Sequence, residues 1–494
     1  MNYNINNILK NHGYNNGAIE KSIHLNLYKA IKNAIINKTL DDNFKLPSSR
    51  LLAKDLEISR STVLKAYELL VLERYIKPKL GSGYYVTSSK LKKNKYRLVN
   101  YSNKGNYPST SRRGNSFRQN IQLINSDSEK GIPFRPGLPP LDVFPVSQWK
   151  SLTNNYWKNV KPSQLSYSNT VGLKSLRENI RDYLKINRNI NCNLNQIIVT
   201  TGSLHSLSLI GDALINPRDE VIIENPTYPH AYSLFSSLKA QIKTANLDSQ
   251  GIKISNIKVS KPKLIYTTPS NQYPTGIKMS LERRIEILKW ASKQNALIIE
   301  DDYNHEFSNW ENPISAIRSI DNQDRVVYLG TFNKLLHPSI RLGYMIVPEY
   351  LIDTVTSLYE QSSRFVAPSQ QQVLSDFIEK DFLNKHLRRV LEVSKERKEI
   401  FCNSFDELFE NKVSLKLNNP GMHLIGFLDN SIEDKKLAKF FKKRNIIVHA
   451  LSDYYMGSNA QNGLVMGYCS VNNKTIKETI VKMKQAYDDY LSLL

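Results

Sequence analysis

Four side chains that can do chemistry together follow two short apolar runs in the second half of the sequence. They are Asp301, Tyr303, Lys334 and Arg341. The runs have the length and composition of buried parallel strands, and polar residues follow each of them at once. Open α/β sheets bind ligands just beyond the carboxyl ends of their strands. We therefore expect a carboxylate, a phenol, an amine and a guanidinium to meet at one edge of a sheet.

This combination of groups is what pyridoxal phosphate (PLP) requires from a protein. An amine forms a Schiff base with its aldehyde, and a carboxylate keeps its pyridine nitrogen protonated. A phenol can bond to the ring oxygen, and a guanidinium pairs with the phosphate. The sequence therefore predicts a PLP site in which Lys334 is the Schiff-base lysine.

The elements that must position these groups are strands and helices in alternation. Strand-like runs are separated by helical patterns such as that of residues 281–293; the runs are IIVTTG, EVIIENP, KLIYTTP, ALIIEDDY and VVYLGTF. The alternation predicts a doubly wound α/β sheet with helices on both faces. After about residue 365 the pattern becomes mixed, which predicts a smaller α+β lobe at the end of a domain of residues 130–494.

Two further strand ends supply residues for the same site. Ser203 and Leu204 follow IIVTT and open a helix, so their backbone N–H groups and the positive end of the helix dipole can hold an anion. Together with Lys334 and Arg341 they predict a phosphate cradle. Tyr228 follows EVIIENP and can stack on a flat ring, although an ordinary core or surface aromatic is the alternative there.

Length and charge indicate more than one domain. A chain of 494 residues is too long for a single core, so two or three domains are expected. The net charge of +23 is uneven, because residues 1–113 hold 21 Lys and Arg against 7 Asp and Glu. Such an excess at one end indicates a module that faces nucleic acid, although a basic surface that only aids solubility is the alternative.

Nothing in the sequence predicts a membrane segment or an oxidising compartment. No apolar run reaches the roughly 18 residues that cross a bilayer, and the first residues lack the apolar stretch of a signal peptide. Cys192, Cys402 and Cys469 lie far apart and form no metal or CxxC pattern. We expect a cytoplasmic protein without a metal site.

Residues 1–87 have the pattern of a winged helix-turn-helix. Apolar residues recur at helical spacing between Leu27 and Ile35. Ser48 or Ser49 can cap a short second helix, and Ser59 can cap a third. The break between these two helices has the length of the turn in a helix-turn-helix. The segment YIKPKLGSGYYV that follows is typical of the hairpin that forms a wing.

The start of the last helix and the wing are where DNA contacts are expected. Recognition helices enter the major groove by their N-terminal residues, and lysines of a wing suit phosphates. The segments LPSSRLLA, SRSTVLKAY and GSGYYV resemble, in order and spacing, the winged helix-turn-helix of GntR-type bacterial regulators. Pattern and resemblance together give the expected DNA-binding residues as Arg50, Arg60, Ser61, Thr62, Lys65, Lys79 and Gly83.

Residues 88–129 separate this module from the larger domain. They are rich in Ser, Asn, Lys and Arg and show no sustained apolar period. This composition predicts a flexible basic linker.

The C-terminal segments resemble fold-type I PLP enzymes of the aspartate aminotransferase kind. TPSNQYPTG, IIEDDYNHEF and GTFNKLLHPSIRLGY carry the resemblance in the family's order. Joined to a GntR-type module, they resemble the MocR family of chimeric regulators over nearly the whole chain. The resemblance implies a Schiff base at Lys334. It also implies that Asp301 contacts the pyridine nitrogen of the cofactor and that Tyr228 stacks on its ring. Tyr303 and Asn271 would lie near the ring oxygen. The phosphate would be held by Ser203, Leu204 and Arg341.

The sequence departs from the family where amino-acid carboxylates are bound. Members that sense amino acids use one arginine near the stacking tyrosine and another late in the terminal lobe. Here His230 takes the first place, and the late segment GLVMGYCSV has no arginine. Histidine cannot supply the planar fork of a guanidinium, so Arg364 and Arg444 remain as conceivable substitutes. Asn271 replaces a usual histidine and Asn333 a usual serine, and both can still donate a hydrogen bond to the cofactor.

These features predict a PLP-dependent transcriptional regulator without net turnover. It would bind operator DNA as a homodimer, because fold-type I sites lie across a dimer interface and operators have two-fold symmetry. The family resemblance implies that this homodimer is domain-swapped, with each N-terminal module crossing to the partner. Since the carboxylate clamp is incomplete, PLP itself is the expected effector, and vitamin B6 synthesis genes are the expected targets, as in the pyridoxine-regulating branch of the family. The alternatives are a regulator that senses an amino acid, a working aminotransferase with a DNA-binding appendage, and a regulator with an empty PLP domain.

Overall fold

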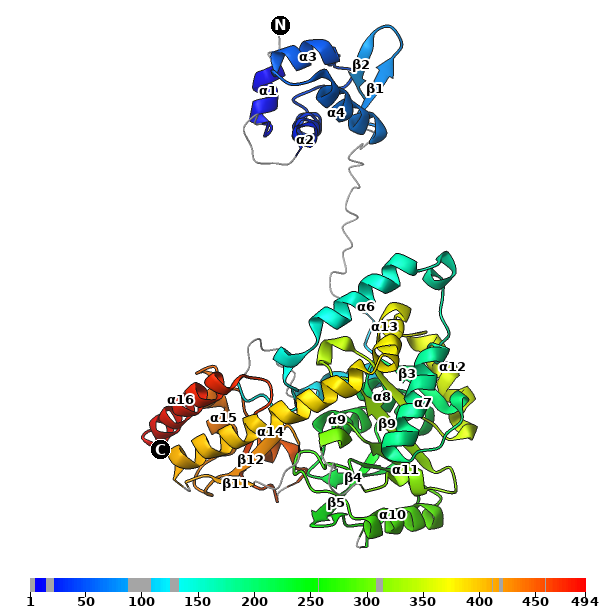
Figure 1. Ribbon diagram of the computed structural model, residues 1–494, viewed down its shortest axis with the longest axis vertical. Coiled ribbons are helices and arrows are strands. Elements are labelled where there is room, and N and C mark those ends of the chain that lie inside the picture. Colours follow the sequence, from blue (N-terminus) through cyan, green and yellow to red (C-terminus); the bar gives the residue numbers. More distant parts are fainter. Residues whose placement is uncertain are drawn as a thin grey trace. The chain divides into compact units, whose positions relative to one another are not determined.

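The structure is a computed structural model of the chain, shown in Figure 1. It describes residues 5–14, 22–87, 108–124, 133–255, 257–307, 314–410, 412–416, 421–457 and 459–494. The chain divides into two compact units, 1–108 and 109–494, and each is described by itself. Most of the expected linker, residues 88–107 and 125–129, lies outside the described residues.

The first unit is a small helical module that ends in a two-stranded sheet. Its elements are α1 (Ile5–Asn11), α2 (Ile23–Ile36), α3 (Ser49–Asp55), α4 (Arg60–Leu72), β1 (Ile76–Lys79) and β2 (Gly83–Val86). The two helix starts form as the serines predict, because Ser48 Oγ accepts the backbone N–H of Leu51 at 3.2 Å and Ser59 Oγ accepts that of Thr62 at 3.1 Å. The strands pair antiparallel, as expected for a wing.

The second unit contains a large sheet, a small sheet and the helices that cover them. Its helices are α5 (Arg112–Asn120), α6 (Val146–Asn159), α7 (Lys174–Arg188), α8 (Ser203–Leu214), α9 (Pro229–Ser237), α10 (Leu281–Gln294), α11 (Ile317–Ile320), α12 (Ile352–Ser362), α13 (Pro368–Glu379), α14 (Phe382–Phe409), α15 (Asp434–Lys442) and α16 (Asn473–Leu491). Its strands are β3 (Ile197–Thr200), β4 (Glu220–Asn225), β5 (Gln241–Asp248), β6 (Gly251–Ile252), β7 (Pro262–Thr267), β8 (Leu297–Asp301), β9 (Val326–Thr331), β10 (Gly343–Ile346), β11 (Ser414–Lys416), β12 (His423–Phe427), β13 (His449–Ala450) and β14 (Gly463–Gly467).

The large sheet has the strand order β3-β10-β9-β8-β7-β4-β5-β6. The strands β5, β4, β7, β8 and β9 run parallel in that order, whereas β10 is antiparallel to both β9 and β3. The expected α/β class with helices on both faces is confirmed, and the sheet is mixed rather than wholly parallel. Parallel strands place their carboxyl ends at one edge, so β7, β8 and β9 deliver the residues that follow them to the same place.

Both faces of the large sheet are buried under helices. Ile197 and Val199 of β3 pack with α6, α7 and α13, whereas Ile198 between them packs with α8, α9 and α12. A further cluster joins β4, β7 and β8 to α10 and α11. Burial on two faces explains why these strands are continuous apolar runs without polar alternation.

The small lobe is a four-stranded antiparallel sheet of order β11-β12-β14-β13, covered by α15, α16 and the end of α14. It begins later than the expected residue 365, because α13 and the start of α14 pack in the core of the large sheet. The 28-residue α14 then runs from the large sheet to the small lobe (Figure 1). Phe134 also belongs to the lobe's core, where its ring lies edge-on to that of Phe401 at 5.0 Å.

Part of the segment expected to be a linker is folded. Helix α5 begins after Ser111, whose hydroxyl accepts the backbone N–H of Gly114 at 2.9 Å. The helix packs on α9, and Ser233 donates to the carbonyl of Asn120 at 3.0 Å. The expectation of a linker is therefore wrong for 112–120. It failed because Ser116 is the one buried side chain of α5, so the helix has no apolar period to detect.

No helix among the described residues is both long and apolar enough to cross a membrane.

Candidate functional site

Lys334 lies just beyond β9 and is half-buried. Its Nζ donates to the carbonyl of Gly137 at 2.6 Å. Burial lowers the pKa of Lys334 to about 8; the nearby Asp301 carboxylate opposes this shift, and the charge of Arg135 adds to it. The amine is therefore partly neutral at neutral pH, which is the form that reacts with an aldehyde.

A pH profile of Lys334 reactivity tests this conclusion. In protein freed of PLP, the rate at which an amine-reactive reagent labels Lys334 is expected to rise about tenfold per pH unit and to level off above about pH 8, because only the neutral amine reacts. Peptide mass spectrometry of the labelled residue gives the rate. A profile that still rises above about pH 10 would show an ordinary lysine and contradict the conclusion.

Asp301 is the last residue of β8, and its carboxyl group is buried. Tyr266 donates its hydroxyl to Oδ2 at 2.8 Å, and Oδ1 has no hydrogen-bond partner among the described residues. Burial raises the pKa of Asp301 to about 7, although the Tyr266 hydroxyl acts in the opposite direction. A carboxyl group in this position gains most from a protonated nitrogen placed beside it, which would hold it ionised.

Two asparagines leave buried polar atoms without partners near the same strand ends. Neither Nδ2 nor Oδ1 of Asn271 forms a hydrogen bond among the described residues, and Oδ1 of Asn333 has none. A buried polar group left unpaired costs about 1–3 kcal/mol, so these atoms are expected to bind a ligand. Donors and acceptors beside Asp301 and Lys334 suit the polar edge of PLP, and the residues present therefore fit that cofactor.

An aromatic wall, formed by Tyr228, His230, Tyr273 and Tyr303, lies around these polar groups. The ring of Tyr228 stacks on that of His230 at 4.9 Å, and Tyr273 lies edge-on to both Tyr228 and Tyr303 at 5.8 Å. Burial, and then the charge of Lys334, lower the pKa of His230 to about 4. Without a ligand His230 is therefore uncharged at neutral pH, and an imidazole cannot supply the planar fork of a guanidinium to a carboxylate.

The start of α8 has the form of a phosphate cradle. Gly202 precedes it with φ of +123°, and the backbone N–H groups of Ser203 and Leu204 lie in the first turn, before the intrahelical bonds begin. Arg341 is exposed, and its charge contributes to lowering the pKa of His205 after the larger effect of burial. The guanidinium of Arg341 therefore acts electrostatically on the first turn of α8, to which His205 belongs.

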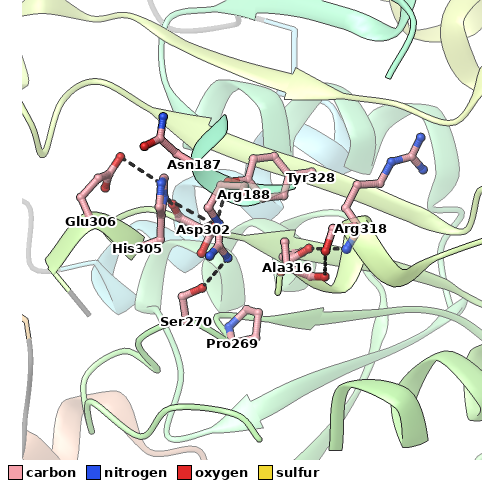
Figure 2. Close-up of polar contacts among 12 residues, drawn as sticks. Asn187, Arg188, Pro269, Ser270, Asp302, His305, Glu306, Ala316, Arg318 and Tyr328 are labelled. Carbon is pink, nitrogen blue, oxygen red and sulfur yellow. Dashed lines mark hydrogen bonds and ion pairs between the residues drawn. The ribbon is translucent and has the colours of Figure 1, made fainter. Parts of the chain in front are cut away.

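A buried ion pair stands behind the strand ends (Figure 2). Nε of Arg188, at the end of α7, lies 2.8 Å from Oδ2 of Asp302, and Tyr328 donates its hydroxyl to the same oxygen at 2.7 Å. Burial opposes the ionisation of Asp302, but Arg188 and then His305 outweigh it and hold its pKa at about 2. Arg188 also donates to Ser270 Oγ at 2.9 Å, so it joins the ends of β7 and β8.

The late segment GLVMGYCSV forms β14 and the residues that follow it, and none of its residues, all of which the structure describes, is an arginine. In β14 that segment buries Val465 with Ile425, Leu451 and Tyr454. The two substitutes considered from sequence are engaged by other partners among the described residues. Arg364 lies over the ring of Tyr167, and Arg444 pairs with Asp489 and lies over Phe440.

Arg135 was missed by sequence reasoning. It is half-buried, its charge contributes to the lowered pKa of Lys334, and it lines a cavity of about 240 Å³. The one signal for it was its place in the segment FRPG, two residues before Gly137. Its proximity to Lys334 could not be predicted, because Arg135 and Lys334 lie far apart in the chain and only the fold brings them together.

The expected DNA-binding residues lie on the surface of the first unit. All are exposed except Thr62, which is half-buried at the start of α4. Arg60 Nε donates to Ser49 Oγ at 3.3 Å, which joins the start of α4 to α3. In the wing, Lys79 lies over the ring of Tyr85 at 4.5 Å. The surface therefore presents a helix N-terminus and a wing with exposed basic groups.

Two protein families match different parts of the chain. Residues 24–86 match the family described as bacterial regulatory proteins of the gntR family. Residues 141–482 match aminotransferase class I and II.

Curated relatives match over nearly the full length. The probable rhizopine catabolism regulatory protein MocR of Rhizobium meliloti is 29% identical over 94% of both chains. The uncharacterised HTH-type transcriptional regulator YdeL of Bacillus subtilis is 30% identical over 96% of this chain and 98% of its own. The HTH-type pyridoxine biosynthesis transcriptional regulator PdxR of Corynebacterium glutamicum is 25% identical over 94% of this chain and 96% of its own.

Solved aminotransferases share the fold of the larger unit. The structure of Pyrococcus horikoshii kynurenine aminotransferase in complex with PMP superposes with a TM-score of 0.67 and 26% identity. The match covers 81% of this chain and 98% of that one. The part of the chain outside the match is about the size of the first unit.

Proposed function

This chain belongs to the MocR-type regulators, in which a gntR-family module precedes an aminotransferase class I and II domain, and we propose that it senses PLP itself and controls genes of vitamin B6 synthesis. The family makes it a PLP-dependent, DNA-binding transcriptional regulator. The effector and the target genes are the part that is proposed.

The observation that carries the proposal is the missing clamp for an amino-acid carboxylate. His230 is uncharged at neutral pH, and the late segment GLVMGYCSV, whose Val465 is buried in an apolar cluster, has no arginine. A carboxylate that is buried without a planar cationic partner costs several kcal/mol. PLP has its own anchors at the site and needs no such clamp. The likeness to a pyridoxine biosynthesis regulator supports the same effector.

Each residue of the site is assigned a part in holding PLP. Ser203 and Leu204 would donate backbone N–H groups to the phosphate, and Arg341 would pair with it. Asp301 would keep the pyridine nitrogen protonated. The remaining contacts are Asn271 and Tyr303 at the ring oxygen and Tyr228 on the ring face.

PLP supplies an aldehyde that condenses with an amine. In this proposal Lys334 presents its neutral Nζ to the aldehyde of PLP. The bond from Lys334 to Gly137 must open for this, and the amine then turns from the backbone toward the site. If the contacts with PLP differ between two arrangements of the protein, PLP shifts the populations of these two arrangements. The affinity for DNA then changes with them.

Competition binding tests the effector. DNA from upstream of the vitamin B6 synthesis genes is titrated with the protein alone, with PLP and with a panel of amino acids. We expect PLP to change the affinity about tenfold, the size of a typical coupling between two sites. A protein that responds to an amino acid and not to PLP would overturn the proposal.

A working aminotransferase is the second candidate. The presence of Asp301 and Lys334 near enough to shift each other's pKa favours it, because these groups suffice for proton transfer at an α-carbon. Turnover also requires a carboxylate anchor. Sustained transamination of a common amino acid, at a turnover number above about 1 per second, would establish this candidate.

The DNA-binding surface predicts a defined salt dependence. Replacing Lys79 by alanine is expected to weaken binding to all DNA sequences and to reduce the slope of log affinity against log salt by about 0.9, because one phosphate contact is lost. Lys10→Ala, an exposed lysine of α1, is the control and is expected to leave the slope unchanged. Fluorescence anisotropy at several salt concentrations gives both slopes, and equal slopes for Lys79→Ala and the parent protein would remove Lys79 from the interface.

A further inference from the structure

A basic pocket lies on the small lobe next to the aromatic wall. We use this name for the cavity of about 240 Å³ lined by Arg135, Lys435, Lys439, Lys442 and His449. A neighbouring cavity of about 520 Å³ shares Lys435 and His449 with it and reaches Tyr228 and His230 of the wall. Asp453 also lines both cavities, so the basic pocket lies beside the cavity that Tyr228 and His230 line.

Helix α15, in the small lobe of Figure 1, supplies the lysines of the pocket from one face. Lys435, Lys439 and Lys442 stand at spacings i, i+4 and i+7, which align on a helix. Leu437 and Phe441 occupy the other side and are buried in the core of the lobe. Packing of the apolar face thus fixes the direction in which the three lysines project.

Positive charge in the basic pocket exceeds the negative charge that faces it. Asp453 is the one acidic residue among those that line the pocket. Its Oδ1 forms an ion pair with Lys435 Nζ at 2.8 Å. Within the described ranges, no carboxylate forms an ion pair with Arg135 or Lys439. A planar guanidinium and an ammonium that share a small cavity make a receptor for an anion with two negative charges.

A chain of contacts connects the basic pocket with the cofactor site. His449 Nδ1 and the Tyr454 hydroxyl form a hydrogen bond at 2.8 Å, and the Tyr454 and Tyr273 hydroxyls are 3.2 Å apart. Tyr273 in turn lies edge-on to Tyr228 and Tyr303. The charge of Arg135 also acts on Lys334 directly. An anion in the pocket would therefore change the environment of Lys334, both through this chain of contacts and through the charge of Arg135.

We propose that the basic pocket binds a small organic dianion, a phosphate monoester or a dicarboxylate, as a second ligand of this regulator. Arg135 and Lys439 bind the anion, and His449 offers its remaining ring nitrogen. The site is separate from the phosphate cradle at α8, since none of its lining residues belongs to that helix start. The proposal goes beyond PLP sensing and stands whether or not PLP is the effector.

Calorimetric titration of the full-length protein, loaded with PLP, tests the pocket. Loading fills the phosphate cradle, so added inorganic phosphate reports on other sites. Inorganic phosphate and glutarate are titrated separately, and the tighter of the two identifies the chemical source of the dianion. Arg135→Gln is expected to weaken the better ligand about tenfold, and Lys439→Gln about threefold, because each removes one charged contact.

The matched control is Lys436→Gln, on the same helix. Lys436 is exposed and pairs with Glu433 at 2.7 Å, away from the pocket lining. The affinity of Lys436→Gln for the better anion is expected to stay within about twofold of that of the parent protein. The proposal is overturned if neither ligand binds the parent protein. It is also overturned if Lys436→Gln and Lys439→Gln lose affinity for the anion equally. Lys439→Gln keeps the test decisive if Arg135→Gln does not fold, because Lys439 lies on a helix surface.

Discussion

Replacing Lys334 by alanine is expected to abolish the visible absorbance of the Schiff base that PLP forms with the protein. The affinity for PLP is expected to fall on the order of 100-fold, because the covalent bond that anchors the cofactor is lost. The phosphate cradle and Asp301 remain in this variant, so residual binding without the absorbance band is expected. Spectra and equilibrium dialysis measure the two effects separately.

The control for this variant is Lys289→Ala, an exposed lysine of α10. It is expected to keep both the spectrum and the affinity. DNA binding adds a second readout, because Lys334→Ala should bind the operator with an affinity that no longer responds to PLP at the concentrations that act on the parent protein. An unchanged absorbance band in Lys334→Ala would place the Schiff base on another lysine and remove the centre of the proposed site.

Replacing Arg188 by leucine is expected to lower the free energy of unfolding of the larger unit by about 3–5 kcal/mol, because it leaves the Asp302 carboxylate buried without its partner. The bonds of Arg188 to Ser270 and to the carbonyl of Ile314 are lost with it. Urea titration followed by circular dichroism of the helices measures the change.

Arg181→Leu provides the comparison on the same helix. Arg181 forms an exposed pair with Asp182, and exposed pairs contribute at most about 1 kcal/mol. Equal losses for the two variants would mean that the buried pair stabilises no more than a surface pair. The loss in Arg188→Leu is also expected to weaken PLP binding, because Asp302 follows Asp301 directly in the chain.

The sheet and the ends of its strands could be predicted because the information is local. An apolar run such as that of β8 is long enough to identify a buried strand, and Asp301 comes at its end. The start of α8 was likewise visible in the small residues that precede it. Parallel strands bring such positions to one edge whatever the details of packing, so Asp301 and Lys334 were placed together in advance.

Other features depend on packing between distant segments, and no local pattern announces them. Helix α5 buries one serine and docks by polar contacts, so its sequence looks like that of a linker. Arg135 acts on the charge of Lys334 only because its segment crosses to the small lobe, where Phe134 is buried. The neutral state of His230 follows from burial and from Lys334, neither of which can be read from its neighbours in the chain.

The carbonyl of Gly137 competes with PLP for the same amine. The 2.6 Å bond from Lys334 has to break before Nζ can react, and a hydrogen bond from a charged donor contributes about 1.5–3 kcal/mol. The apparent affinity for PLP is then lower by about tenfold or more than it would be for a free lysine. If PLP is the effector, as proposed above, this hydrogen bond to the Gly137 carbonyl would raise the PLP concentration at which the protein begins to respond.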